Sequence, residues 1–355
     1  MKISTAHLYR YSIPLKSPVK LARTVLHQRE GLILQITDDS GLSGFGEISP
    51  FPGFSRETLD EAETEISMIL DCSSDGLTID YLKNKINPAS PSIKFGIESA
   101  IIDLESKING TSIAKLLKKN PRESVSVNGL LTGSTEEILK KATEYSQNSY
   151  KAVKLKVSSD RIQNDIELTK LVRKAIGDKV LLRLDANRAW QIDDAQEFCE
   201  AVAGCDINYL EEPVVNRTML IELLKKGATP LPIALDETTR EISPKELGQY
   251  KVKAIVLKPT LLGFQTTLDF AQEAHRLGIT PVIGSSFETG LGLSILAQIA
   301  AALNIDETPA GLDTYSWFVE DIIRGSLPVK NGRIILNELA GSETVLNSPL
   351  LKKLI

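Results

Sequence analysis

The sequence predicts an α/β fold in which short parallel strands alternate with helices, and two observations carry this prediction. From residue 124 onward, β-branched runs alternate with amphipathic stretches. The runs lie roughly 22 to 29 residues apart, about the size of one strand-plus-helix unit. Eight units in about 200 residues are what a (β/α)8-type barrel requires. The runs read SVSVNGL, AVKLKV, VLLRLDA, INYLEE, LPIALDE, KAIVLKP, ITPVIGS and PAGLDT.

An open, doubly wound sheet is the alternative arrangement for such alternation. That fold commonly carries a glycine-rich phosphate loop after its first strand, and no GxGxxG motif is present. The barrel is therefore the preferred prediction, with PAGLDT as its weakest strand.

The N-terminal portion follows a different pattern. ISTAHLYRYSIPL and GLILQITD are strand-like, and DDSG after the second supplies a turn. Helical spacing follows over residues 56–70 and 92–117, the latter broken at Asn109-Gly110. These features predict a small α+β unit, and GRIILNEL near the C-terminus is expected to return to its sheet as a strand.

Composition bounds the class of protein without indicating an activity. The 355 residues carry 41 Lys and Arg against 46 Asp and Glu, so the net charge of −5 gives no positive field for nucleic acid. No N-terminal apolar run resembles a signal peptide, and none reaches the ~18 residues of a membrane span. Three cysteines without a CxxC pair suit a reducing compartment. We expect a cytoplasmic protein with a small-molecule substrate, and the oligomeric state stays open.

Carboxylates stand at the C-terminal ends of three consecutive predicted strands, at Asp185, Glu211 and Asp236. These strand ends share one face of a barrel, so the three charges would repel one another unless a cation lay between them. A single Asp there is usually a turn former or helix cap, but three together indicate a metal site. Oxygen ligands suit Mg²⁺, and Mn²⁺ is expected to substitute for it.

Lysines complete the pattern. Lys154 and Lys156 are two residues apart and share a face of the second strand, while Lys258 ends the sixth. One such lysine is usually a solvated rim residue. Because strands two and six lie opposite each other in an eight-stranded ring, substrate on the metal would lie between two amines. This arrangement predicts proton abstraction next to a carboxylate. A Schiff-base aldolase would use a lysine without needing three carboxylates.

Several further residues are candidates for support of this site. Arg183 shares the face of Asp185, and Glu212 points to the opposite face from Glu211, where it could orient a ligand. The GSSFETGLG segment offers small residues and amides as a cradle for a substrate carboxylate, although an ordinary serine-rich loop and helix cap fits as well. The residues of this group expected to bind substrate are Arg183, Ser285, Ser286 and Gly311.

The ordered motifs KLK, LRLDANRAW, YLEEP, LDET, VLKPTLLG, SSFETGLGL and GLDT resemble the enolase superfamily, in its muconate-lactonising subgroup. GEISPFPGFSRET in the N-terminal part extends the resemblance over nearly the full length. It implies a capping domain made of residues 1–118 and the tail 326–355, closing over a catalytic barrel of residues 119–325.

The resemblance also implies an activity, the Mg²⁺-dependent syn dehydration of 2-succinyl-6-hydroxy-2,4-cyclohexadiene-1-carboxylate to o-succinylbenzoate in menaquinone biosynthesis. Lys156 would remove and return the proton, and Lys258 would face the enolate as a cation. The metal ligands would be Asp185, Glu211 and Asp236. Lys154 would lie beside the substrate carboxylate, and Arg183 and Asn187 would support the ligand layer.

Two other functions remain as alternatives. Two opposed lysines also suit a racemase of N-succinylamino acids or a dipeptide epimerase, although the second Asp of a DxD motif expected in such an epimerase is missing after Asp313. A catalytically silent barrel used for binding would be expected to have lost a ligand or a lysine, and none is missing.

Overall fold

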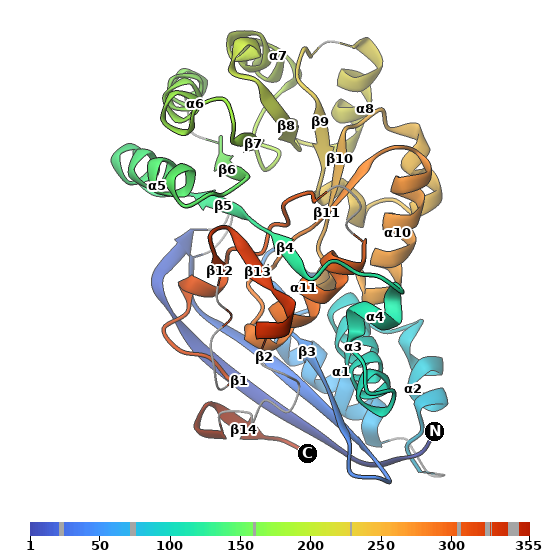
Figure 1. Ribbon diagram of the computed structural model, residues 1–355. Helices are drawn as coiled ribbons and strands as arrows, with labels where there is room; N and C mark the ends of the chain where they lie inside the picture. The colour runs from blue at the N-terminus through green and yellow to red at the C-terminus, as the bar shows by residue number, and fades with distance from the viewer. Residues whose placement is uncertain are drawn as a thin grey trace.

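The computed structural model describes residues 1–20, 25–71, 76–158, 161–227, 229–303, 307–323, 327, 329–339 and 348–355. They form a barrel of parallel strands and a separate antiparallel sheet covered by helices (Figure 1). No helix in these ranges has the length and apolar character needed to cross a membrane.

Seven parallel strands form the barrel wall, in the order β11-β10-β9-β8-β7-β6-β5. The eighth run contributes only Ala310 and Gly311, which bridge to Val127 on one side and Gly284 on the other. The barrel prediction is confirmed, with an eighth strand reduced to two residues. The strands are β5 Asn128–Leu131, β6 Ala152–Lys156, β7 Leu181–Asp185, β8 Ile207–Glu211, β9 Ile233–Leu235, β10 Ala254–Leu257 and β11 Thr280–Ile283.

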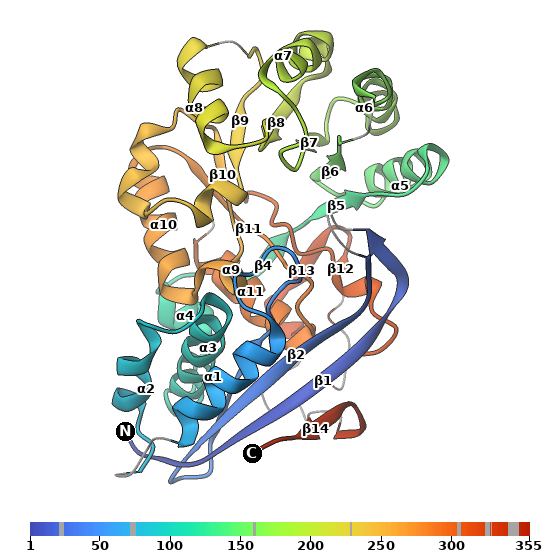
Figure 2. The ribbon, with the colours of Figure 1, turned by 180° about the vertical axis from the view of Figure 1, so that it is seen from behind.

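Helices follow these strands and lie on the outside of the barrel (Figure 2). Local sequence sets their ends. In the first of them, for example, Ser134 and Glu137 form a reciprocal capping box. The helices are α5 Thr135–Gln147, α6 Ile162–Ile176, α7 Ile192–Ala201, α8 Arg217–Lys226, α9 Pro259–Leu262, α10 Phe264–Arg276 and α11 Gly290–Leu303.

The N-terminal portion is the α+β unit that the sequence predicts. Its sheet has the order β14-β1-β2-β3, and its helices bury an apolar face against that sheet. The DDSG turn joins the second and third strands, with Gly41 at a φ of 89°. The elements are β1 Ile3–Lys20, β2 Val25–Asp38, β3 Ser43–Ile48, α1 Leu59–Asp71, α2 Ile79–Ile86, α3 Pro91–Ile108 and α4 Ile113–Leu117.

Glycines allow α3 to lie directly on β3. A Cβ added to Gly46 would come within 1.8 Å of the carbonyl oxygen of Gly96, and one added to Gly96 would meet Ile48 at 2.2 Å. Neither clash can be relieved by a flexible side-chain end, so this close approach needs glycine at both positions. The contact fixes the strand that leads into the GEISPFPGFS loop.

The C-terminal segment divides between the two sheets. β13, Arg333–Ile335, pairs with β4, Ser124–Ser126, and with β12, Val329–Lys330. The expectation that GRIILNEL joins the N-terminal sheet was therefore wrong, because its backbone completes a small sheet at the entry to the barrel. The last strand, β14, Leu351–Lys353, does pair with β1. The exact domain limits at residues 118 and 325 stay a prediction.

Candidate active site

The three predicted carboxylates lie at neighbouring strand ends, all of them buried. Asp185 ends β7, Glu211 ends β8 in register with it, and Asp236 directly follows β9. Glu211 is fully buried, so its charge needs a partner nearby.

Lys154 supplies that partner. Its Nζ lies 2.7 Å from Oδ2 of Asp185 and 2.8 Å from Oε1 of Glu211, so one ammonium bridges two carboxylates from neighbouring strands. Lys154 thus points toward the carboxylates that end β7 and β8. Burial lowers the pKa of Lys154, but the attraction of Asp185 and Glu211 outweighs burial and leaves that pKa well above its usual value.

Lys258 and Asp236 form a second ion pair on the other side of the group. The Nζ of Lys258 donates to Oδ2 of Asp236. Burial opposes the charge on each partner, yet the pair outweighs it, so the pKa of Lys258 is raised and that of Asp236 is lowered.

The oxygen atoms of the three carboxylates suit a divalent cation, but their present arrangement is not that of a metal site. Among the described residues no group of three carboxylate, imidazole or thiol side chains is set to hold a metal, and Lys154 and Lys258 are ion-paired with the three carboxylates. However, Oε2 of Glu211 is buried and has no hydrogen-bond partner among the residues that the structure describes. Burial and then repulsion from Asp185 raise the pKa of Glu211 well above its usual value. An unpartnered carboxylate oxygen in an all-oxygen set is what Mg²⁺ requires.

Lys156 differs from the other two lysines. It ends β6 beside Asp185 in the strand register, and its side chain is exposed. Within the described part of the chain it makes no hydrogen bond or ion pair. Lys156 and Lys258 stand on strands separated by β7, β8 and β9, as predicted for residues on opposite sides of the mouth.

Glu212 organises the loop after β9. Its Oε1 accepts the backbone amides of Asp236 at 2.9 Å and Thr238 at 2.7 Å, and its Oε2 accepts Nε of Arg188. A φ of 41° at Glu212 turns the chain at the end of β8. The predicted supporting position thus corresponds to a specific set of contacts. Asn187 contributes its backbone amide, which donates to Oδ1 of Asp185 at 3.0 Å.

Arg183 does not belong to this site, which corrects its predicted role in substrate binding. The guanidinium donates to the side chains of Asn128 and Asn208 and to the carbonyl of Pro309, and it stacks on Tyr209. Arg183 stands two residues before Asp185 on β7, closer to the N-terminal end of the strand. The groups that it contacts therefore lie toward the N-terminal ends of the barrel strands.

The GSSFETGLG loop also differs from its predicted use. The amides of Ser285 and Ser286 are already bonded, to the carbonyl of Gly311 and to the carboxylate of Glu288. Oγ of Ser285 is bonded to Glu288 as well, at 2.7 Å, which leaves the buried and unpartnered Oγ of Ser286 as the free donor. Gly311 lies in the barrel wall. Both serine amides of the expected cradle are therefore occupied, and substrate binding by Ser285, Ser286 and Gly311 stays a prediction.

The start of α11 holds carboxylates of the protein itself. Glu47, fully buried on β3, accepts the amides of Thr289 and Gly292. Asp321 accepts the amide of Gly290. The helix end that the sequence suggested for a substrate anion thus ties the N-terminal sheet to the barrel.

The N-terminal unit also reaches the site, and the sequence did not identify the residues involved. Phe54, in the loop after β3, lies with its ring centroid 6.0 Å from Nζ of Lys258, and its carbonyl accepts Nη1 of Arg240. Phe51 stacks on Phe54 and on Phe287. The aromatic residues in GEISPFPGFS were the available signal. Glu237 was missed as well; burial, then repulsion from Asp236, raises its pKa to about 7.

Two family models match this chain, one over the barrel and one over the N-terminal unit. The family model "Enolase C-terminal domain-like" matches residues 137–345, and "MenC, N-terminal domain" matches residues 3–104. The o-succinylbenzoate synthase of Aliivibrio fischeri is 33% identical over 324 residues, covering 89% of this chain and 92% of that protein. That of Klebsiella pneumoniae is 33% identical over 339 residues, covering 93% and 98%. The chain belongs to the o-succinylbenzoate synthase family of the enolase superfamily.

A solved enolase-superfamily structure has the same overall fold. A dipeptide epimerase from Enterococcus faecalis V583, complexed with Mg and the dipeptide L-Leu-L-Tyr, superposes with a TM-score of 0.85. It is 26% identical, and the match covers 96% of this chain and 99% of that one. Family membership therefore applies to both parts of the molecule, the capping unit as well as the barrel.

Proposed function

We propose that this chain is an o-succinylbenzoate synthase, a hydro-lyase that converts 2-succinyl-6-hydroxy-2,4-cyclohexadiene-1-carboxylate to o-succinylbenzoate in menaquinone biosynthesis. The observation that carries the proposal is the placement of Lys156, a lysine unpaired among the described residues, beside a buried group of three carboxylates and a second lysine on the far strand. Similarity to the named synthases over both parts of the chain supports the choice of substrate.

Lys156 is the catalytic base and acid in this proposal. Its free amine takes the proton from the carbon next to the substrate carboxylate. The resulting ammonium lies on the same face and gives that proton to the hydroxyl group as the carbon–oxygen bond breaks, so water leaves by syn elimination. The ring gains aromatic stability in this step. One lysine thereby serves both halves of the reaction.

Lys258 stabilises the negative charge that develops on the substrate carboxylate. Its side chain lies between Asp236 and the Phe54 ring, a surrounding that keeps it protonated and partly shielded from water. Asp185, Glu211 and Asp236 would hold Mg²⁺, with Mn²⁺ as a substitute. When bound, the metal lowers the energy of the charge on the substrate carboxylate. Lys154 would then be released toward that carboxylate.

Racemisation of N-succinylamino acids, or epimerisation of dipeptides, is the second candidate function. It is favoured by the two lysines on opposite strands and by the fold shared with the dipeptide epimerase. In such a reaction Lys258 would exchange a proton with substrate, whereas in the dehydration it stays a cation.

The deciding experiment compares both reactions on one Mg²⁺-loaded preparation. We expect kcat/KM for dehydration of the cyclohexadiene substrate to exceed kcat/KM for racemisation of N-succinylamino acids and for epimerisation of dipeptides. Solvent deuterium uptake into unreacted N-succinylamino acid provides an independent measure of racemase chemistry. A higher efficiency in racemisation would overturn the synthase assignment. We place this enzyme in the cytoplasm, from its cysteine content.

A further inference from the structure

A second cavity, of about 700 Å³, opens at the opposite end of the barrel from the site described above. Its lining residues stand at the beginnings of the strands. Lys151 directly precedes β6, Leu181 begins β7 and Thr280 begins β11. None of the proposed catalytic or metal-holding side chains lines it. Its volume is in the range of small-molecule sites, which is roughly 300 to 1,000 Å³.

The lining of this basal cavity carries an excess of positive charge. Among the described residues that line it there are four cations, and Glu307 is the single carboxylate. That carboxylate pairs with Arg122, with Lys151 and also with Arg333. The exposed side chain of Lys253 has no ion pair with any residue that the structure describes. The four lining cations are Arg122, Lys151, Arg183 and Lys253.

Arg183 is the residue whose charge most needs a partner. Its side chain is 1% exposed, so its charge is removed from bulk water. Its hydrogen bonds go to neutral acceptors, the two asparagine side chains and one backbone carbonyl described above, through Nε and Nη1. Nη2 donates to no residue in the described ranges, and no carboxylate there forms an ion pair with Arg183. A buried charge without a counter-charge is strongly unfavourable.

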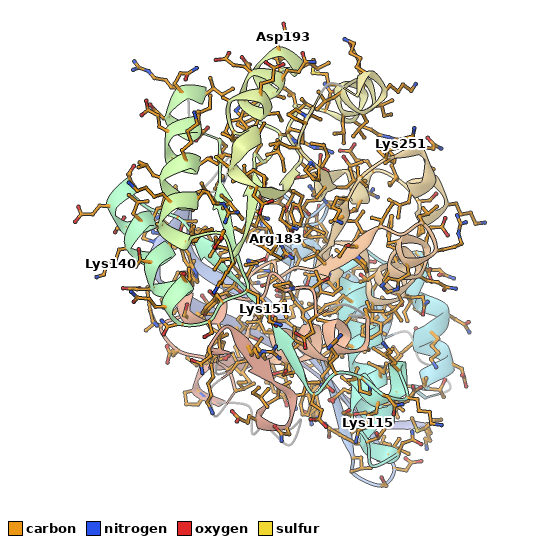
Figure 3. The ribbon with its side chains drawn as sticks, turned by 45° about the horizontal axis from the view of Figure 1, so that its top comes forward. Lys115, Lys140, Lys151, Arg183, Asp193 and Lys251 are labelled. Carbon is orange, nitrogen blue, oxygen red and sulfur yellow. The ribbon has the colours of Figure 1, made fainter. Side chains whose placement is uncertain are left out.

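We propose that this basal cavity binds a small oxyanion carrying two or more charges, either a phosphate or a di- or tricarboxylate. Arg183 lines the cavity with its Nη2 unbonded among the described residues, and a planar guanidinium suits phosphate and carboxylate oxygens. Lys253 and Lys151 supply further positive charge at the rim. In Figure 3, Arg183 and Lys151 lie near the centre of the view, whereas Lys251, which does not line the cavity, lies toward the upper right. The site is separate from the proposed reaction and uses none of its residues.

Calorimetric titration of the full-length protein tests this proposal. Pyrophosphate, inorganic phosphate and citrate are added separately at constant ionic strength in chloride, and we expect one saturable site. Lys253→Met should weaken binding about tenfold, because it removes one charge-assisted contact. Lys251→Met is the matched control, since this exposed lysine is two residues away and does not line the cavity. It should leave the affinity unchanged.

Two further variants separate this site from other sources of binding. Arg183→Met should abolish the titration signal; if it fails to fold, Lys151→Met and Lys253→Met still test the cavity. Lys156→Ala should retain full binding, which excludes the anion from the proposed active site. Tighter binding of pyrophosphate than citrate would assign the site to phosphates, and the reverse order to carboxylates. The absence of saturable binding, or equal losses in Lys251→Met and Lys253→Met, would overturn the proposal.

Discussion

The carboxylate of Glu212 accepts a hydrogen bond from the backbone amide of Asp236 at 2.9 Å. Glu212 directly follows Glu211 in the chain, so the residue next to one proposed metal ligand positions another, Asp236. The same carboxylate holds Thr238 by its amide and its hydroxyl. The loop after β9 therefore takes its shape from a side chain on β8, and the two strand ends are mechanically linked.

Glu212→Gln should weaken the apparent affinity for Mg²⁺ by about 10- to 100-fold, the usual effect of removing a group that orients metal ligands. The amide cannot accept all four of the donors that Glu212 now holds. Titration calorimetry with Mg²⁺ measures the effect directly. Glu200→Gln, an exposed change on α7, is the control and should leave the affinity unaltered. An unchanged affinity in Glu212→Gln would remove that residue from its positioning role.

Lys154→Met should destabilise the metal-free protein by about 3 kcal/mol, because it leaves Asp185 and Glu211 buried without their counter-charge. Mg²⁺ should then raise Tm by more in the variant than in the wild type. Thermal unfolding of the wild type and of the variant, each in EDTA and in Mg²⁺, provides the four Tm values needed. Equal Mg²⁺-induced shifts in the two proteins would show that the metal does not bind these carboxylates.

Lys156→Ala should reduce dehydration by at least about a hundredfold, since it removes the proposed base and acid. Its side chain is exposed and unpaired in the described structure, so Tm should stay within about 1 °C of the wild type. A coupled spectroscopic assay of o-succinylbenzoate formation and a thermal melt test both expectations. Retention of more than a few per cent of the activity would exclude Lys156 from the chemistry.

Removal of divalent cations with EDTA should abolish turnover, and Mg²⁺ or Mn²⁺ should restore it. Binding of Mn²⁺ can be followed independently by its electron paramagnetic resonance signal. We expect Asp185→Asn to lose that binding, because it removes one carboxylate from the proposed ligand set. Full activity in EDTA would contradict the proposed metal role.

Asp313 gives the stability a specific pH dependence. Burial raises the pKa of Asp313 to about 6, although hydrogen bonds from Tyr145 and from the backbone of Leu130 lower it. The folded protein then binds this proton more tightly than the unfolded chain. Protonated Asp313 therefore stabilises the fold below about pH 4, and this contribution is lost as the pH rises through about 6.

Asp313→Asn should remove this pH dependence. Relative to the variant, the wild type should lose about 2 kcal/mol between pH 4 and pH 7, measured by urea unfolding. The exposed Asp193→Asn change serves as the control. A wild-type minus variant difference that is constant with pH would contradict the raised pKa.

The strand-end chemistry could be predicted because strand geometry has a fixed period of two. Lys154, Asp185 and Glu211 project into one barrel interior for this reason. The period does not say which way a long side chain leans along the barrel axis. Arg183 therefore shared a predicted face with Asp185 and yet lies in the basal cavity.

Features beyond the strands escaped prediction for a different reason. Asn187, Arg188 and Glu212 adopt positive φ values of 45°, 61° and 41°, where neither strand nor helix periodicity applies. Phe54 reaches Lys258 only through the docking of a separate unit. These contacts depend on tertiary packing over long sequence distances, which local pattern cannot encode.

The bridge that Lys154 makes between Asp185 and Glu211 bears on the order in which this enzyme is assembled. In small zinc domains the chain stays unfolded until the ion arrives, because nothing else neutralises the ligands. Here an ammonium of the chain itself pairs with two of the proposed ligands and offsets part of their charge. We therefore expect the chain to fold without the proposed metal, so that metal loading is a separate and later event.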